Sequence, residues 1–307
     1  MMQPLRSLLL LLVGLATGTH QSLASAGDSG MPLLKMGLPV RATALADASV
    51  SWVRGAAAAW HNPAGVRTAQ GTVELMLVHR EWIQDAQLEF LGASFPLGEG
   101  NALGFSLATQ SVPEIEIRTR PGEPEGTFSA RTLSVGLSYS HEMTESIRLG
   151  ATAKFLYEKI LIDEASGIGF DAGVQWQTPL PELTVGFALS NLGSMSSLRD
   201  EATTLPSMVR TGASWQEELE TLRASAFLTA DLLYVIPEGA AYGGLGGEVL
   251  LWETVALRAG YHLGSEGRGL TAGLGVAHGI LSVDYAYAAI ARDLGNAHSI
   301  GITLSLQ

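Results

Sequence analysis

The sequence predicts an all-β fold: a 14-stranded antiparallel transmembrane β-barrel with a small N-terminal helical hatch. Three observations support this prediction. Hydrophobic residues make up 47% of the 307 residues and charged residues only 16%, a composition that is apolar for a soluble protein of this size. Beyond the N-terminus no apolar run approaches the roughly 18 residues of a membrane-spanning helix, and a membrane protein without such runs must be a closed barrel. From Gly71 onward, side chains alternate with period two.

The first residues have the features of an export signal. Arg6 precedes an apolar run from Leu8 to Ala16, and Ala24 and Ala26 supply a small-x-small cleavage pattern. We therefore predict that residues 1–26 are a cleaved signal peptide. The alternative, a short membrane anchor, is disfavoured because the run is too short to span a bilayer.

The next part of the chain, residues 27–70, is the predicted hatch. Its central stretch, residues 41–66, is rich in Ala, lacks period-two alternation and ends in Asn62-Pro63-Ala64-Gly65. Pro63 disfavours helix at Asn62, and Gly65 permits an unusual turn. We predict a small, mostly helical plug at the periplasmic mouth of a barrel. The alternative is a plain helix-terminating loop without functional consequence.

Residues 71–307 are the predicted barrel. In residues 132–140 and 299–307 one face is apolar and the other carries Ser, Thr, Gly or Gln, the pattern of a strand with an apolar outer and a polar inner face. The same pattern throughout predicts strands that begin near Gly71, Ala86, Asn101, Phe128, Glu145, Ser166, Glu182, Ser207, Thr221, Ala241, Thr254, Gly269, Ile280 and Ala297.

The connections between these strands alternate in length, as the short periplasmic turns and longer outer loops of outer-membrane barrels do. A soluble sandwich has no reason for this alternation. Long polar connections are expected at residues 111–126 and 192–206, and the hatch and both termini are expected on the side of the short turns. The short connections are at residues 96–100, 142–144, 178–181, 217–220, 252–253 and 278–279.

Charged residues within the strands fall opposite the apolar face. This placement is expected of a membrane barrel, because Lys or Arg facing lipid at the midplane costs about 2–4 kcal/mol. The plainer interpretation is a hydrated interior with structural ion pairs; a binding site is the other. The predicted lumen charges are Arg148, Lys154, Asp171, Arg210, Arg223, Asp231, Arg258 and Asp284.

Several kinds of chemistry leave no trace in the sequence. A net charge of −12 without a basic cluster argues against nucleic acid as a partner. There is no cysteine, the seven histidines lack metal-ligand spacing, and no glycine motif precedes a helix as a dinucleotide site requires. We therefore predict no metal, no cofactor and no enzymatic activity. A hydrolase that takes one His and one Ser from different strands is the open alternative.

The chain resembles the PorV/PorQ family and the wider group of FadL-like outer-membrane barrels. The resemblance rests on a hatch motif and on short segments in the same order along the barrel. In two places the chain departs from the family, with Ala46 where Gly is frequent and Leu306-Gln307 in place of a terminal aromatic residue. The hatch motif comprises Arg41, Asp47, Asn62, Pro63, Ala64 and Gly65, and the barrel segments include Ser190-Asn191-Leu192-Gly193, Arg258-Ala259-Gly260-Tyr261 and Asp284-Tyr285-Ala286-Tyr287.

This resemblance implies a protein of the bacterial outer membrane that acts in transport or in protein secretion. PorV-like members are receptors in type IX secretion for the C-terminal domains of secreted proteins. FadL-like members pass hydrophobic small molecules through a hatch-gated barrel. The implied partners are thus outer-membrane lipid and either a hydrophobic small molecule or a secreted-protein C-terminal domain. The PorV/PorQ-type role is the main expectation and the FadL-like channel is the alternative, and the residues do not choose between these two activities. A purely structural β protein is the third and less favoured alternative.

Overall fold

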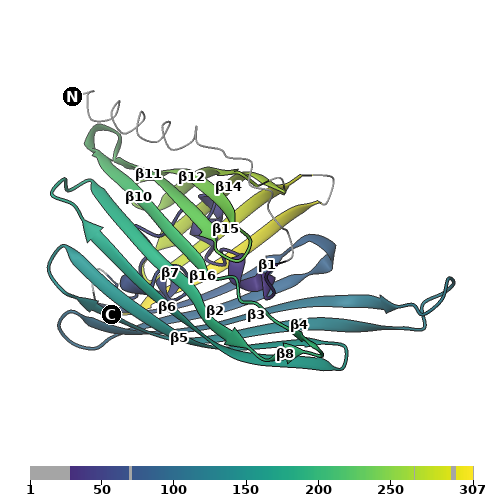
Figure 1. The fold of residues 1–307 in the computed structure, drawn as a ribbon. Helices are drawn as coiled ribbons and strands as arrows, with labels where there is room; N and C mark the ends of the chain where they lie inside the picture. Colours follow the sequence, from purple (N-terminus) through teal and green to yellow (C-terminus); the bar gives the residue numbers. More distant parts are fainter. Residues whose placement is uncertain (1–27, 69–70, 266, 292–294, 307) are drawn as a thin grey trace.

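The computed structural model describes residues 28–68, 71–265, 267–291 and 295–306; the predicted signal peptide lies outside these ranges. Strands β1–β7 and β10–β16 form one closed antiparallel barrel of fourteen strands, in which β1 pairs with β16 (Figure 1). The barrel strands are β1 (Val73–Glu81), β2 (Gln87–Pro96), β3 (Asn101–Ile117), β4 (Gly126–Glu142), β5 (Ile147–Ile160), β6 (Asp163–Gln177), β7 (Leu183–Met195), β10 (Met208–Leu219), β11 (Ala224–Val235), β12 (Ala240–Leu251), β13 (Val255–Leu263), β14 (Arg268–His278), β15 (Leu281–Ile290) and β16 (Asn296–Leu306).

The predicted barrel is therefore confirmed, strand by strand. The largest offsets between expected and observed starts are three residues, at β6 (Asp163 against Ser166) and β11 (Ala224 against Thr221). Period-two alternation predicts these boundaries well because every strand has one face toward lipid or solvent and one toward the lumen.

The two faces of the wall have the polarity of a membrane barrel. On the outside, Leu137 in β4 is 60% exposed and Ile300 in β16 is 50% exposed. On the inside, Ser138 and Ser299 are 1% and 2% exposed. Small polar side chains are thus buried, and large apolar side chains are exposed, which is the reverse of a soluble fold and matches a lipid-facing apolar band.

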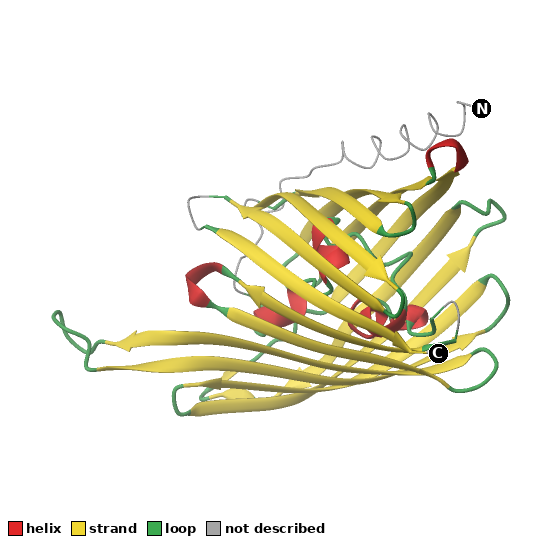
Figure 2. Ribbon diagram, turned by 180° about the vertical axis from the view of Figure 1, so that it is seen from behind, coloured by secondary structure: helices red, strands yellow, loops and turns green. Residues whose placement is uncertain are grey.

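The barrel has two different ends. The turn end carries the six short connections (residues 97–100, 143–146, 178–182, 220–223, 252–254 and 279–280) and the last residues of β16. The opposite end is called the loop end below. At the loop end, β3 to β6 extend beyond the other strands as a tall wall (Figures 1 and 2).

Two predicted long loops are shorter than expected. Strands β3 and β4 are 17 residues each, so that only residues 118–125 remain as a loop where residues 111–126 were expected. Pairing continues across a bulge between Val112 and Ile115 because Ile115 still pairs with Phe128. In the second loop, β7 continues to Met195, and the short strands β8 (Ser197–Leu198) and β9 (Glu201–Ala202) pair with each other.

Residues 28–68, called the luminal segment, lie inside the barrel (Figure 2). They contain η1 (Pro32–Lys35), α2 (Val40–Ala44), η2 (Gly55–Ala57), α3 (Ala58–His61) and η3 (Pro63–Gly65). The expectation of a mostly helical plug is thus only partly met, because single helical turns alternate with loops. Within the described ranges, no helix is both long and apolar enough to cross a membrane.

The position of this segment also corrects the expected plug at the mouth. It enters the lumen because glycines on the inner face leave room for its backbone: a Cβ at Gly150 or Gly186 would lie less than 3.0 Å from Pro63 or Val50, respectively. Its first described residues reach the loop end, where the Gly30 amide donates to the Thr204 carbonyl (2.9 Å). The segment therefore runs through the lumen and does not sit below it.

Candidate functional site

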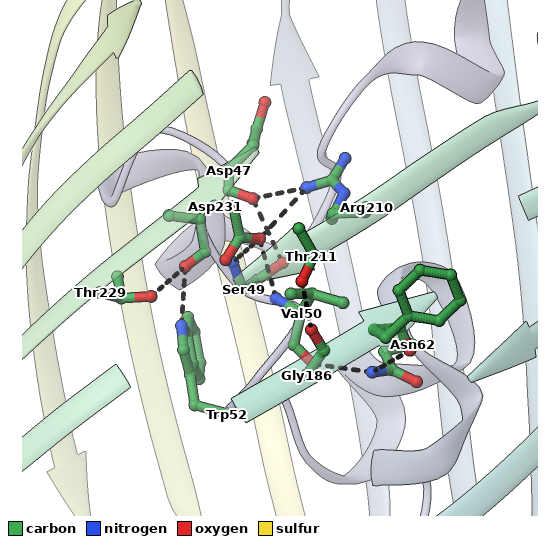
Figure 3. Close-up of polar contacts among 12 residues, drawn as sticks. Asp47, Ser49, Val50, Trp52, Asn62, Gly186, Arg210, Thr211, Thr229 and Asp231 are labelled. Atoms are coloured by element: carbon green, nitrogen blue, oxygen red, sulfur yellow. Dashed lines mark hydrogen bonds and ion pairs between the residues drawn. The ribbon is translucent and has the colours of Figure 1, made fainter. Parts of the chain in front are cut away.

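The last residues of the luminal segment are held by the side chain of Asn62. This side chain is fully buried. Its Oδ1 accepts a hydrogen bond from the Ala64 amide (3.1 Å), and its Nδ2 donates to the carbonyls of Val50 (2.7 Å) and Val174 in β6 (3.2 Å). Asn62 therefore connects the η3 turn, the middle of the segment and the barrel wall. Figure 3 shows its contact with Val50.

The barrel wall also hydrogen-bonds directly to the backbone of the segment. Asp231 Oδ2 accepts from the amides of Ser49 (2.8 Å) and Val50 (3.0 Å), as Figure 3 shows. Gln175 Nε2 donates to the carbonyls of Val50 (3.2 Å) and Val53 (3.0 Å). These bonds pair buried backbone groups that have no helix or sheet partner. Gln175 is not among the site residues predicted from the sequence, and its inward position on β6 is the one signal that points to it.

Arg41 in α2 binds the luminal segment to strand β12 of the barrel wall. Its guanidinium forms a bidentate ion pair with Glu248 in β12 (2.8 and 2.7 Å) and lies over the ring of Trp52 at 4.2 Å. Arg258 bonds the same Glu248 (2.5 Å) and Asp284 (2.5 Å). The predicted residues Arg41, Arg258 and Asp284 thus meet in one network. Glu248 is at the centre of this network. It is not among the predicted lumen charges, although it alternates with the outward-facing Val249 on β12.

The structure places most of the predicted lumen charges on the inner wall. Lys154 and Asp171 pair at 2.6 Å with side chains 3% and 2% exposed, and Arg210 lies 3.8 Å from Asp231. Arg148 is also buried.

The predicted position of Arg223 in the lumen is wrong. Arg223 lies in the β10–β11 turn after η5 (Glu220–Leu222), is exposed, and has a left-handed backbone (φ 47°). Strand β11 begins one residue later than Arg223 because the turn needs four residues at this point. Arg223 is therefore not one of the inward-facing strand residues, although the period-two pattern of the sequence places it among them.

Asp47 lies at a tight turn deep in the lumen. Ala46 and Asp47 both have positive φ (55° and 58°), a backbone conformation that glycine adopts more readily than other residues. Asp47 Oδ2 pairs with Arg268 at 3.0 Å. Burial by itself would raise the Asp47 pKa, but Arg268 and neighbouring cations lower it to about 2. The carboxylate is therefore ionised at neutral pH.

His61 is buried at the end of α3, and its Nε2 has no described partner. Burial, and then the positive charge of Arg210, lower its pKa from 6.5 to about 3. In the seated segment His61 is thus neutral, whereas a hydrated His61 takes up a proton below pH 6.5. Seating of the segment is therefore most stable above this pH and weakens as the pH falls toward 3.

We expect the titration of His61 by itself to have loosened the segment by about 2 kcal/mol at pH 5 relative to alkaline pH, with a slope that approaches about 1.4 kcal/mol per pH unit well below pH 6.5. Asp47 does not contribute there, because its stabilisation is lost only below its ordinary pKa of 3.8. The chain has no cysteine, so maleimide labelling of a buried Ser51→Cys reports opening. Labelling should accelerate at low pH, and His61→Gln should flatten the dependence. An unchanged slope in His61→Gln would contradict this assignment.

A cavity of about 260 Å³ lies between the luminal segment and strands β10 to β14, toward the loop end. The segment contributes Pro32, Lys35, Met36 and Asp47, and the wall contributes charged and apolar side chains together. The wall side includes Arg210, Asp231, Leu233, Val235, Tyr242, His262 and Arg268. In the described part of the chain, no three His, Asp or Glu residues are grouped to hold a metal ion.

Comparison with known proteins finds similarity only at the level of structure. No family model matches the sequence, and no curated protein matches it. The CymD monoaromatic hydrocarbon channel is similar with a TM-score of 0.63 and 15% identity, covering 88% of this chain and 98% of CymD. The toluene transporter TbuX of Ralstonia pickettii has a TM-score of 0.60 at 14% identity (88% and 99% covered). A FadL homologue of Pseudomonas aeruginosa has a TM-score of 0.53 at 14% identity (87% and 96% covered).

These likenesses show the fold: the chain has the barrel architecture of FadL-like outer-membrane channels. At such low identity they do not show the activity of the chain. The finer resemblance to PorV/PorQ proteins stays a prediction from the sequence.

Proposed function

We propose that this protein is a channel of the bacterial outer membrane for small, largely apolar molecules, and that the luminal segment is its hatch. The observation that carries this proposal is a segment seated inside the barrel with a cavity beside it near the loop end. The exposed apolar outer wall supports a membrane location. If the short turns face the periplasm, as in outer-membrane barrels generally, the cavity lies toward the outside.

The fold neighbours support a transport role more than a role in secretion, since the similar structures described above are channels or transporters. The receptor role that the PorV resemblance implies is the second candidate. Its surface would be the exposed hairpin of β3 and β4, in which Arg118 pairs with Glu116 (2.7 Å). Removal of residues 118–125 separates the two candidates: small-molecule passage should survive in a channel, and partner capture should be lost in a receptor.

We expect a crosslink between the hatch and the wall to block passage. A Cβ at Gly301 in β16 would lie 3.5 Å from the Cβ of Val40 in α2, within the roughly 3.5–4.5 Å range of disulfides. Oxidised Val40→Cys/Gly301→Cys should therefore slow toluene uptake by intact cells to the level of cells without the protein, and reduction should restore it. Val40→Cys alone, with and without oxidant, is the matched control.

The outcomes of this experiment separate the two parts of the proposal. No toluene entry through the unmodified protein would refute the channel. Entry that is the same in the oxidised and reduced double variant would show that the segment does not act as a gate.

A further inference from the structure

The cavity beside the luminal segment contains three carboxylates, each of which has at least one oxygen already bonded. Asp47 Oδ2 pairs with Arg268 (3.0 Å), and Glu238 Oε1 pairs with Lys35 (2.5 Å). Asp231 Oδ2 accepts the two backbone amides described above. A ligand cation would have to compete with these bonds, which are charge-assisted and among the stronger ones in proteins.

The remaining oxygens of the two deepest carboxylates are turned away from the cavity. Asp47 Oδ1 and Asp231 Oδ1 are buried without a described hydrogen-bond partner. A Cβ at Gly37 would lie less than 3.0 Å from the first, and a Cβ at Gly212 less than 3.0 Å from the second. Neither glycine lines the cavity. These acceptors are therefore covered by backbone and are not offered to a ligand.

The hydrogen-bond donors of the cavity are less fully used. Arg210 and Arg268 each have five N–H groups, of which Nη1 of each contacts Asp47: Arg210 its carbonyl (2.6 Å) and Arg268 its carboxylate (3.0 Å). No described residue forms a hydrogen bond with the Tyr242 hydroxyl or the His262 ring, and both line the cavity. The available polar surface is thus mainly made of donors.

An apolar patch lies in the same cavity. Leu233 and Val235 of β11 line it together with Pro32 and Met36 of the segment. The volume of about 260 Å³ is at the lower end of small-molecule sites, which span about 300–1,000 Å³. It suits one ring or a short chain and leaves no room for a long one.

From these observations we propose that the cavity binds a small organic anion, with one anionic group held by Arg210 and Arg268 and a compact apolar body against Leu233 and Val235. This inference rests on the proposed channel function and makes its substrate class specific. A neutral hydrocarbon such as toluene should still pass the channel but bind in this cavity more weakly than the anion, because donors without a ligand acceptor would be desolvated without compensation.

Calorimetric titration of the full chain in detergent at neutral pH tests this inference with three probes of similar shape: benzoate, benzyl alcohol and benzylamine. We expect benzoate to bind at least about tenfold more tightly than the other two, since hydrogen bonds to a charged group contribute about 1.5–3 kcal/mol. Equal affinities, or tighter binding of benzylamine, would overturn the inference, and so would the absence of binding by all three.

Two variants test the assigned residues. Arg268→Gln should weaken benzoate binding about tenfold and leave benzyl alcohol unchanged. Arg268→Gln also removes the ion pair with Asp47 of the luminal segment. Tyr242→Phe leaves this pair in place and therefore provides a second, milder change, which should weaken benzoate binding severalfold. The exposed Arg120→Gln is the matched control, with its side chain 84% exposed. Toluene uptake by intact cells with and without the protein, measured separately, distinguishes the failure of this inference from failure of the channel itself.

Discussion

Gly150→Ala is expected to unseat the end of the luminal segment. A Cβ at this position in β5 would lie less than 3.0 Å from the backbone of Pro63 and Ala64, and backbone cannot move aside as a flexible side chain can. Overpacking of this kind costs about 1–3 kcal/mol. We expect the fraction of open segment to rise about 5- to 150-fold, measured as the labelling rate of Ser51→Cys and as channel conductance in planar bilayers.

The neighbouring strand offers a matched control for this change. Gly169 in β6 also faces inward, but its nearest neighbour for an added Cβ is Leu156 Cδ1 at 3.5 Å, an ordinary contact. Gly169→Ala should therefore label and conduct like the unmodified protein. If both alanine variants behave alike, the contact between Gly150 and the segment is not what keeps the lumen closed.

Asp171→Ala is expected to destabilise the barrel itself. The change leaves Lys154 buried without its partner at 2.6 Å, and breaking a buried ion pair in this way costs about 3–5 kcal/mol. It also removes the acceptor of the Asn191 amide (2.8 Å), which sits in a bulge with φ 61°. The free energy of unfolding in detergent micelles should fall by this amount.

Two further variants locate the cause of that loss. Lys154→Met with Asp171→Leu removes both charges and should recover at least about half of the stability, leaving two groups of Asn191 without their partners: its amide and its Oδ1, which accepts from Lys154 (3.0 Å). Glu125→Ala, at an exposed pair with Arg120 (3.9 Å), should cost less than about 1 kcal/mol. A double variant as unstable as Asp171→Ala would show that the ion pair is not the source of the effect.

The predicted hatch motif illustrates how far residue patterns reach. The pattern around Asn62 and Pro63 correctly predicts that a compact turn ends the helical stretch, because proline and asparagine act on their own backbone. What the turn contacts depends on Val174 in β6, which is 112 residues away from Asn62. No local rule supplies such a partner.

The fourteen strands, their starts to within three residues and their inner and outer faces all follow from the alternation of residues in the sequence. They do so because lipid on one side and the lumen on the other act on every second residue, so the signal is local and repeats along each strand. The same alternation misplaced Arg223, because the exact length of a turn is not part of a period-two pattern.

The position of the luminal segment, and the cavity that remains between it and the barrel wall, depend on tertiary contacts. Its seat is built from pairs such as Ser49 and Asp231, which are 182 residues apart, and from glycines such as Gly150 and Gly186 that leave space for backbone. Glycines that make room for the backbone of the segment do not recur at a fixed spacing. A contact across the lumen depends on barrel closure and on strand register. Barrel closure and strand register exist only after the wall has formed.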